Sequence, residues 1–253
     1  MARRSEPLSR LSELPALEVG RVGGIPVRLD ATFLVMAIAI LLSLFLGRGL
    51  GWWQFFLAHA LVLAGITLSI LGHELGHAIA ARAYGLRAEQ IRIGAFFGLV
   101  ELSGEAAYRS QAIAILLAGP AANAIFLSVL WLLLGAPALT DHLYFGKPAI
   151  DTGVAGLPVL RVSLQWLALA NFGMLVFNLL PAFPLDGGRI AHILLAPAAG
   201  DARAVRIVAA TGMLVGVWSF FGFALNSAFI FVGMLLAYAN YAILSGRIDA
   251  PAD

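Results

Sequence analysis

The hydrophobic pattern of this chain consists of long apolar segments separated by short polar ones. About 20 mainly apolar residues are needed for a helix to cross the hydrocarbon core of a bilayer. The pattern therefore predicts an all-α polytopic membrane protein with about six transmembrane helices. These spans are expected at about residues 31–47, 55–81, 112–134, 160–180, 205–223 and 225–244.

The segment between the second and third predicted spans has a different pattern. Apolar and polar residues alternate over 91–93 and again over 100–102, with Gly94 and Gly98 between them. This pattern predicts a small β-hairpin or sheet, which must lie at the interface or in a cavity because an open strand edge cannot face lipid. Two interpretations remain open: an edge that binds an extended peptide by strand addition, and a plain connector.

Composition supports a membrane protein. Only 12% of the residues are charged, against roughly 25% in soluble domains, and the mean hydropathy is +0.92. Cysteine is absent, which excludes disulfides, a thiolate nucleophile and cysteine-ligated metals. The net charge of +2 gives no case for nucleic acid binding. We expect one membrane-embedded domain over 1–253, with an N-terminal segment (1–30), a six-span core (31–245) and a short tail (246–253).

The distribution of basic residues predicts the orientation in the membrane. Six spans place both termini on one side, and that side holds all but three of the 16 lysine and arginine residues. Basic residues are enriched on the cytoplasmic side, so both termini are expected to be cytoplasmic. The arginine-rich, nearly lysine-free composition points to a prokaryotic cell membrane. The three on the other side are Arg48, Lys147 and Arg161.

A metal-binding pattern lies within the second predicted span. His73 and His77 are four residues apart on a helix, so they share a face and can bind one metal ion. Glu74 lies beside that face, where it can act as a base without being a ligand. Gly76 allows a substrate or a neighbouring backbone to come close. Ionisable residues inside a membrane are candidates for a functional site, which favours a metal site over a chance pattern.

A catalytic zinc site needs a third protein ligand, and few candidates exist. His59 lies 14 residues before His73, roughly 21 Å along a helix. His142 is in the predicted outer loop, and nothing directs His192 inward. These three histidines are therefore poor candidates.

Asp186 is the favoured third ligand, because it follows the cytoplasmic end of the fourth span at the expected depth of the two histidines. Pro181 and Pro184 end the helix before it, and Gly187 and Gly188 allow close backbone approach. The alternative is that Asp186 caps a short helix that begins at Gly187.

Three motifs together resemble the site-2 protease family of intramembrane zinc metalloproteases, in a minimal form without a PDZ or CBS domain. They are His-Glu-Leu-Gly-His at 73–77, Gly-Pro-Ala-Ala-Asn at 119–123, and the segment 178–187, which begins with Asn and ends with Leu-Asp-Gly. The resemblance covers roughly residues 20–245. It implies one Zn²⁺ per chain bound by His73, His77 and Asp186, with Glu74 as the catalytic acid/base.

The resemblance also implies a substrate class. The family hydrolyses peptide bonds in transmembrane or juxtamembrane segments of membrane-anchored proteins, in regulated intramembrane proteolysis. Anti-sigma factors, membrane-tethered transcription regulators and signal-peptide remnants are the implied partners. Asn123 and Asn178 are expected to contact the substrate or the oxyanion, whereas Asn171 is expected to bridge helices.

Two other functions are weaker. A metalloprotease that cleaves polar substrates at the membrane surface usually takes its third ligand from a later glutamate, and no glutamate follows Glu105. A metal transporter would need polar residues along a transmembrane path, whereas the candidates cluster at one depth.

Overall fold

The computed structural model describes residues 15–42, 52–94, 98–134, 158–222 and 227–250. These residues form two compact units. The first comprises Pro15–Gly104 and Ala118–Leu175, and the second includes Glu105–Leu117 and Val176–Asp253.

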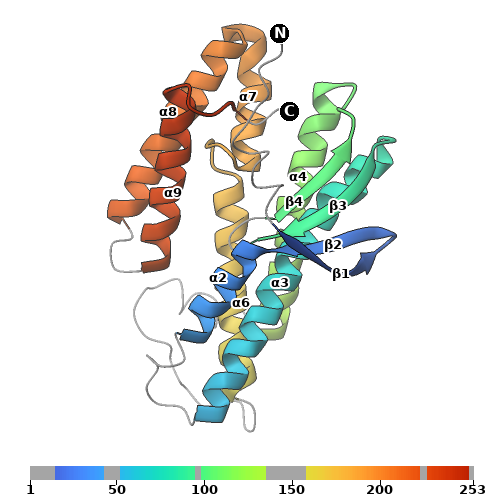
Figure 1. Cartoon of the computed structure of the whole chain (residues 1–253), viewed down its shortest axis with the longest axis vertical. Coiled ribbons are helices and arrows are strands. Elements are labelled where there is room, and N and C mark those ends of the chain that lie inside the picture. The colour runs from blue at the N-terminus through green and yellow to red at the C-terminus, as the bar shows by residue number, and fades with distance from the viewer. Residues whose placement is uncertain (1–14, 43–51, 95–97, 135–157, 223–226, 251–253) are drawn as a thin grey trace. The chain divides into compact units, whose positions relative to one another are not determined.

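A four-stranded sheet lies in the first unit (Figure 1). Its strands β1 (Ala16–Val22), β2 (Ile25–Asp30), β3 (Arg87–Ile93) and β4 (Gly98–Ser103) lie in that order. The β1–β2 and β3–β4 pairs are antiparallel, and β2 is parallel to β3. The predicted β3–β4 pair is confirmed. The expected extent of the sheet is corrected, because β1 and β2 come from the region before Ala31, where only an N-terminal segment was expected.

The sheet is held against the long helix α3 (Trp52–Ala83) by a shared apolar core. Side chains of β2 and β3 alternate, so one set faces this helix. The buried residues of this core are Ile25, Val27, Ile70, Ala78, Ile91 and Ile93. The core fixes the sheet to the part of α3 that carries the histidine motif.

The remaining elements are helices, and five of them together with α3 lie at the six predicted spans. Those not yet named are α2 (Ala31–Leu42), α4 (Arg109–Leu134), α6 (Pro158–Asn178), α7 (Asp186–Ala199), α8 (Asp201–Gly222) and α9 (Ser227–Leu244). Among the described residues, three stretches are long and apolar enough to cross a membrane: Phe56–Ala83, Arg109–Leu133 and Asp201–Ser219. Six spans therefore stay a prediction, and residues 43–47 and 223–226, on which it partly depends, lie outside the described part.

Glycines let several helices approach closely. A Cβ at Gly65 would lie 2.4 Å from the Leu167 side chain, which shows tight contact between α3 and α6. In the second unit, α8 and α9 run along each other (Figure 1). A Cβ at Gly216 would lie 2.5 Å from the backbone nitrogen of Ala237. Gly216 is therefore a position at which these two helices pack closely.

Candidate metal centre

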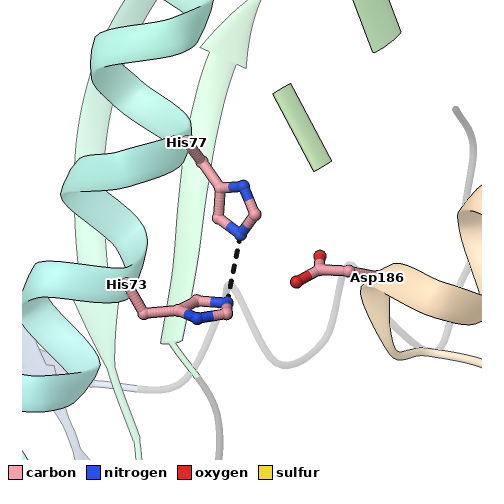
Figure 2. Close-up of side chains that lie close together, drawn as sticks. All are labelled: His73, His77 and Asp186. Carbon is pink, nitrogen blue, oxygen red and sulfur yellow. Dashed lines mark hydrogen bonds between the residues drawn. The ribbon is translucent and has the colours of Figure 1, made fainter. Parts of the chain in front are cut away.

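Two buried histidines of α3 form the centre of the candidate site. Nε2 of His73 lies 3.1 Å from Nε2 of His77, and the rings meet edge to face with centroids 4.7 Å apart. Figure 2 marks this contact. Two nitrogens that share a tetrahedral zinc ion at about 2.0–2.1 Å are about 3.3 Å apart. The spacing of the two imidazole nitrogens therefore fits a shared zinc ion.

Gly119 lets the backbone of α4 lie against both imidazoles. A Cβ at this position of α4 would lie 2.3 Å from Nε2 of His77 and 2.7 Å from Nε2 of His73. A methyl group there would crowd both nitrogens, and glycine avoids this contact. Together with the 3.1 Å spacing of the two nitrogens, the residues present fit a zinc ion.

The backbone of α4 reaches this place because α3 also has a glycine. A Cβ at Gly76 would lie 2.4 Å from the carbonyl oxygen of Ala118. The predicted close approach at Gly76 is confirmed as contact with a neighbouring backbone.

A chain of buried hydrogen bonds extends from His73 into three helices. Nδ1 of His73 lies 2.5 Å from Oδ1 of Asn123, and Nδ2 of Asn123 donates to Oδ1 of Asn171 at 3.1 Å. Nδ2 of Asn171 donates to Oγ of Ser69 and to the carbonyl oxygen of Leu167. The predicted helix-bridging role of Asn171 is confirmed. A substrate contact by Asn123 stays a prediction.

Glu74 is buried and lies against the start of β4. A Cβ at Gly98 would lie 2.3 Å from Oε1 of Glu74. The start of β4 therefore packs against the carboxylate of Glu74, and the missing side chain of Gly98 permits this contact.

Asp186 belongs to the second unit and is buried at the start of α7. The N-cap position of α7 is Leu185 and not Asp186, so the capping interpretation is wrong. A Cβ at Gly187 would lie 2.3 Å from the carbonyl oxygen of Leu179, and one at Gly188 would lie 2.4 Å from that of Ala182. The close approach expected of both glycines is confirmed.

His73, His77 and Asp186 are a group of side chains that could hold a metal ion, and Figure 2 shows them on α3 and α7.

The other candidate residues have different surroundings. Nε2 of His192 lies 2.8 Å from Oδ1 of Asp201. Asn178 is the last residue of α6 and is partly buried. His142 lies outside the described residues.

Sequence reasoning missed three residues that shape the site. Gly119 and Gly98 make room for the imidazoles and for Glu74. Asn240 of α9 holds the backbone of Phe183, three residues before Asp186, through its Oδ1 and Nδ2 atoms. An asparagine within an apolar helix is costly in the membrane, and this signal could have identified Asn240. Gly119 was noted only as part of the 119–123 motif and Gly98 only between the two alternating segments, and neither was assigned to the site.

Comparison with known proteins gives a consistent result. The sequence profile of peptidase family M50 matches residues 61–155 and 152–221, more than half of the chain. The protein Rip3 of Mycobacterium tuberculosis is 34% identical over 185 residues, which are 64% of this chain and 43% of that protein. The zinc metalloprotease MJ0392 of Methanocaldococcus jannaschii is 27% identical over 197 residues, 78% of this chain and 50% of that protein. The chain thus spans about half the length of these relatives.

A solved structure shares the fold. The site-2 protease from Methanocaldococcus jannaschii matches with a TM-score of 0.62 at 24% identity, over 91% of this chain and 95% of that one. At this identity the match shows the fold alone.

Proposed function

The chain belongs to peptidase family M50, and we propose that it is an intramembrane zinc endopeptidase. It would hydrolyse peptide bonds in transmembrane or juxtamembrane segments of membrane-anchored proteins. The observation that carries the proposal is the pair of imidazole nitrogens 3.1 Å apart beside Gly119, on a helix long and apolar enough to cross a membrane. Ionisable side chains within a membrane helix are costly and are candidates for a functional site.

The proposed ligands of one zinc ion are His73, His77 and Asp186. Two neutral imidazoles and a carboxylate are a donor set that suits zinc and leaves a fourth position open. Asp186 is buried, and Gly187 and Gly188 allow the backbone that follows it to pack closely against residues 179–183. Zinc bound there would supply Lewis acidity for the hydrolysis of an amide.

Glu74 is the proposed acid/base. Its carboxylate is buried beside the first ligand, and the start of β4 restricts its movement at Gly98. It would accept a proton from the attacking water and donate it to the leaving amine. In addition, Asn123 or Asn178 would donate a hydrogen bond to the substrate or to its oxyanion.

The proposed substrate is a membrane helix that unwinds locally. Helical carbonyl groups are occupied by hydrogen bonds, so a scissile bond must first become extended. β4 is an edge strand of the described sheet, and it begins at Gly98, next to the carboxylate of Glu74. An extended substrate could add to that edge by backbone hydrogen bonds. By family resemblance, anti-sigma factors, tethered transcription regulators and signal-peptide remnants are the substrate candidates, cleaved near the cytoplasmic side.

The decisive test is Glu74→Gln in detergent-solubilised protein. Because glutamine keeps the shape but cannot accept the proton, we expect unchanged zinc content and a loss of cleavage by at least about 100-fold. The measurements are zinc content by elemental analysis and cleavage of a model transmembrane substrate. Cleavage at the wild-type rate would reject Glu74 as the base. Equal cleavage of a soluble peptide would favour the surface protease.

The third ligand is tested in the same assays. Asp186→Ala removes one of the three proposed ligands, so zinc content should fall and cleavage should be lost. Full zinc occupancy in this variant would reject Asp186 as a ligand. If the wild type binds a metal ion but cleaves no membrane substrate, the transporter becomes the better explanation.

A further inference from the structure

Three buried polar side chains form a continuous hydrogen-bonded chain behind His73. Ser69 of α3, Asn123 of α4 and Asn171 of α6 are each at most 3% exposed. A buried amide costs free energy unless its donors and acceptors are paired. Each donor and acceptor in this row of hydrogen bonds must therefore have a partner, and the row ends at His73.

The amide of Asn171 can have only one orientation. Its Nδ2 lies 2.8 Å from the carbonyl oxygen of Leu167, which can only accept a hydrogen bond. It also lies 2.9 Å from Oγ of Ser69, whose own hydrogen is donated to the carbonyl oxygen of Gly65. Two acceptors thus face Nδ2, and Oδ1 of Asn171 must point towards Asn123.

This orientation passes through Asn123 to the imidazole. Because Oδ1 of Asn171 accepts, Asn123 must turn its Nδ2 towards it, at 3.1 Å. Oδ1 of Asn123 then faces Nδ1 of His73 at 2.5 Å, so Nδ1 must carry the hydrogen. In the neutral ring, Nε2 is left with its lone pair directed towards His77, 3.1 Å away.

We propose that Asn171 is a positioning residue that fixes the tautomer of His73 through Asn123, so that Nε2 is presented as a metal ligand. The inference rests on the proposed zinc site. The other tautomer carries its hydrogen on Nε2 and cannot bind a metal there. The backbone carbonyl of Leu167 sets the orientation of both amides, because it can only accept a hydrogen bond.

The test variant is Asn171→Leu. Leucine cannot accept from Asn123, so the amide of Asn123 can turn over and offer its NH₂ group to Nδ1. We then expect both tautomers of His73 and a zinc affinity lower by about 10–100-fold, as is usual when the hydrogen bond of a metal-binding histidine is lost. The tautomer is read by ¹⁵N NMR of histidine-labelled apo-protein in micelles, at mildly alkaline pH. Comparison with His73→Gln identifies the signal of His73 among five histidines.

Ser163→Ala is the matched control. Oγ of Ser163, also on α6, is buried and bonded to the carbonyl oxygens of Val159 at 2.8 Å and of Ala58, on α3, at 3.4 Å. This hydroxyl bridges the same two helices without a link to His73. We expect the wild-type tautomer and zinc affinity in this variant.

A rescue separates positioning from a general structural effect. Adding Asn123→Asp to Asn171→Leu places a carboxylate beside Nδ1, and a carboxylate can only accept. The double variant should return His73 to the Nδ1–H tautomer and recover most of the zinc affinity. A purely structural role of Asn171 would not be repaired by this change.

The outcomes are distinct. If His73 of the wild type carries its hydrogen on Nε2, the inference is overturned, whether or not any variant folds. The same conclusion follows if Asn171→Leu behaves like Ser163→Ala. If the wild type has the expected tautomer but binds no zinc, the proposed function fails, and Asn171 keeps only its control of the imidazole.

Discussion

Individual glycines decide whether the candidate site can accept a metal ion. The clearest is Gly119, because a Cβ at this position would crowd the Nε2 atoms of both histidines. A methyl group there could be accommodated only by moving the far ends of the two imidazoles, which are the proposed ligands. A residue that does not itself bind the metal thus decides whether the two histidines can bind it.

For Gly119→Ala we expect a protein that folds but does not hold zinc. The added methyl would lie 2.3 Å from Nε2 of His77 and 2.7 Å from Nε2 of His73. Zinc content by elemental analysis and thermal unfolding of the apo-protein are the two measurements. The matched control is Gly173→Ala on α6, where a Cβ would meet nothing within 4 Å and should stabilise the helix by up to about 1 kcal/mol. Normal zinc binding in Gly119→Ala would disprove the close fit.

At this scale, the sequence identified ionisable residues well and their neutral partners poorly. His73, Glu74 and His77 stand out because charge-bearing side chains are rare in an apolar helix. The partners of Asn171 were not predictable, since Asn171 is 102 positions from Ser69 and 48 from Asn123. Such pairings depend on how three helices pack, which no local pattern encodes.

At the scale of elements, β4 and α3 together place Glu74. The strand is antiparallel to β3, and the apolar core fixes β3 to α3. The start of β4 is therefore held at the carboxylate of Glu74, where only glycine avoids a clash. The proposed base and the strand edge that could bind substrate therefore belong to one packed group of elements, α3, β3 and β4.

Gly98→Ala should separate catalysis from metal binding. The added Cβ would lie 2.3 Å from Oε1 of Glu74, and its three nearest atoms all belong to that side chain, so the carboxylate must move. We expect zinc content as in the wild type and cleavage reduced by about 100-fold, the effect typical of a lost general base. Zinc content and the rate of cleavage are measured on the same samples. Gly119→Ala is expected to lose zinc, whereas Gly98→Ala is expected to keep it. Zinc loss in both variants would contradict this prediction.

Half of the sheet was predictable and half was not. The β3–β4 hairpin has alternation close in sequence, whereas β2 pairs in parallel with β3 more than 60 positions later, Val27 opposite Ile91. Nearly all of β1 is exposed, so it lacks the alternation that marks a half-buried strand. The turn Gly23-Gly24 between apolar residues was the available signal. The helices were found because a long apolar run is a strong signal by itself.

At the scale of the whole molecule, the number of membrane crossings determines where the termini lie. Three helices meet the length and hydropathy of a membrane span among the described residues, and six segments were predicted from the pattern. An even number places both termini on one side, whereas an odd number separates them. The strong bias of basic residues favours six crossings with both termini in the cytoplasm.

The absence of cysteine makes this topology directly testable, because single cysteines can be introduced without background labelling. We expect Thr140→Cys, in the predicted outer loop, to react with a membrane-impermeant maleimide in intact cells. Ser9→Cys and Ser245→Cys, near the two ends, should react only after the membrane is permeabilised. The unmodified chain is the control for labelling of other groups. Labelling of Ser9→Cys and Ser245→Cys from opposite sides would require an odd number of crossings. Labelling of both from outside would reverse the orientation and move the proposed cleavage to the other face of the membrane.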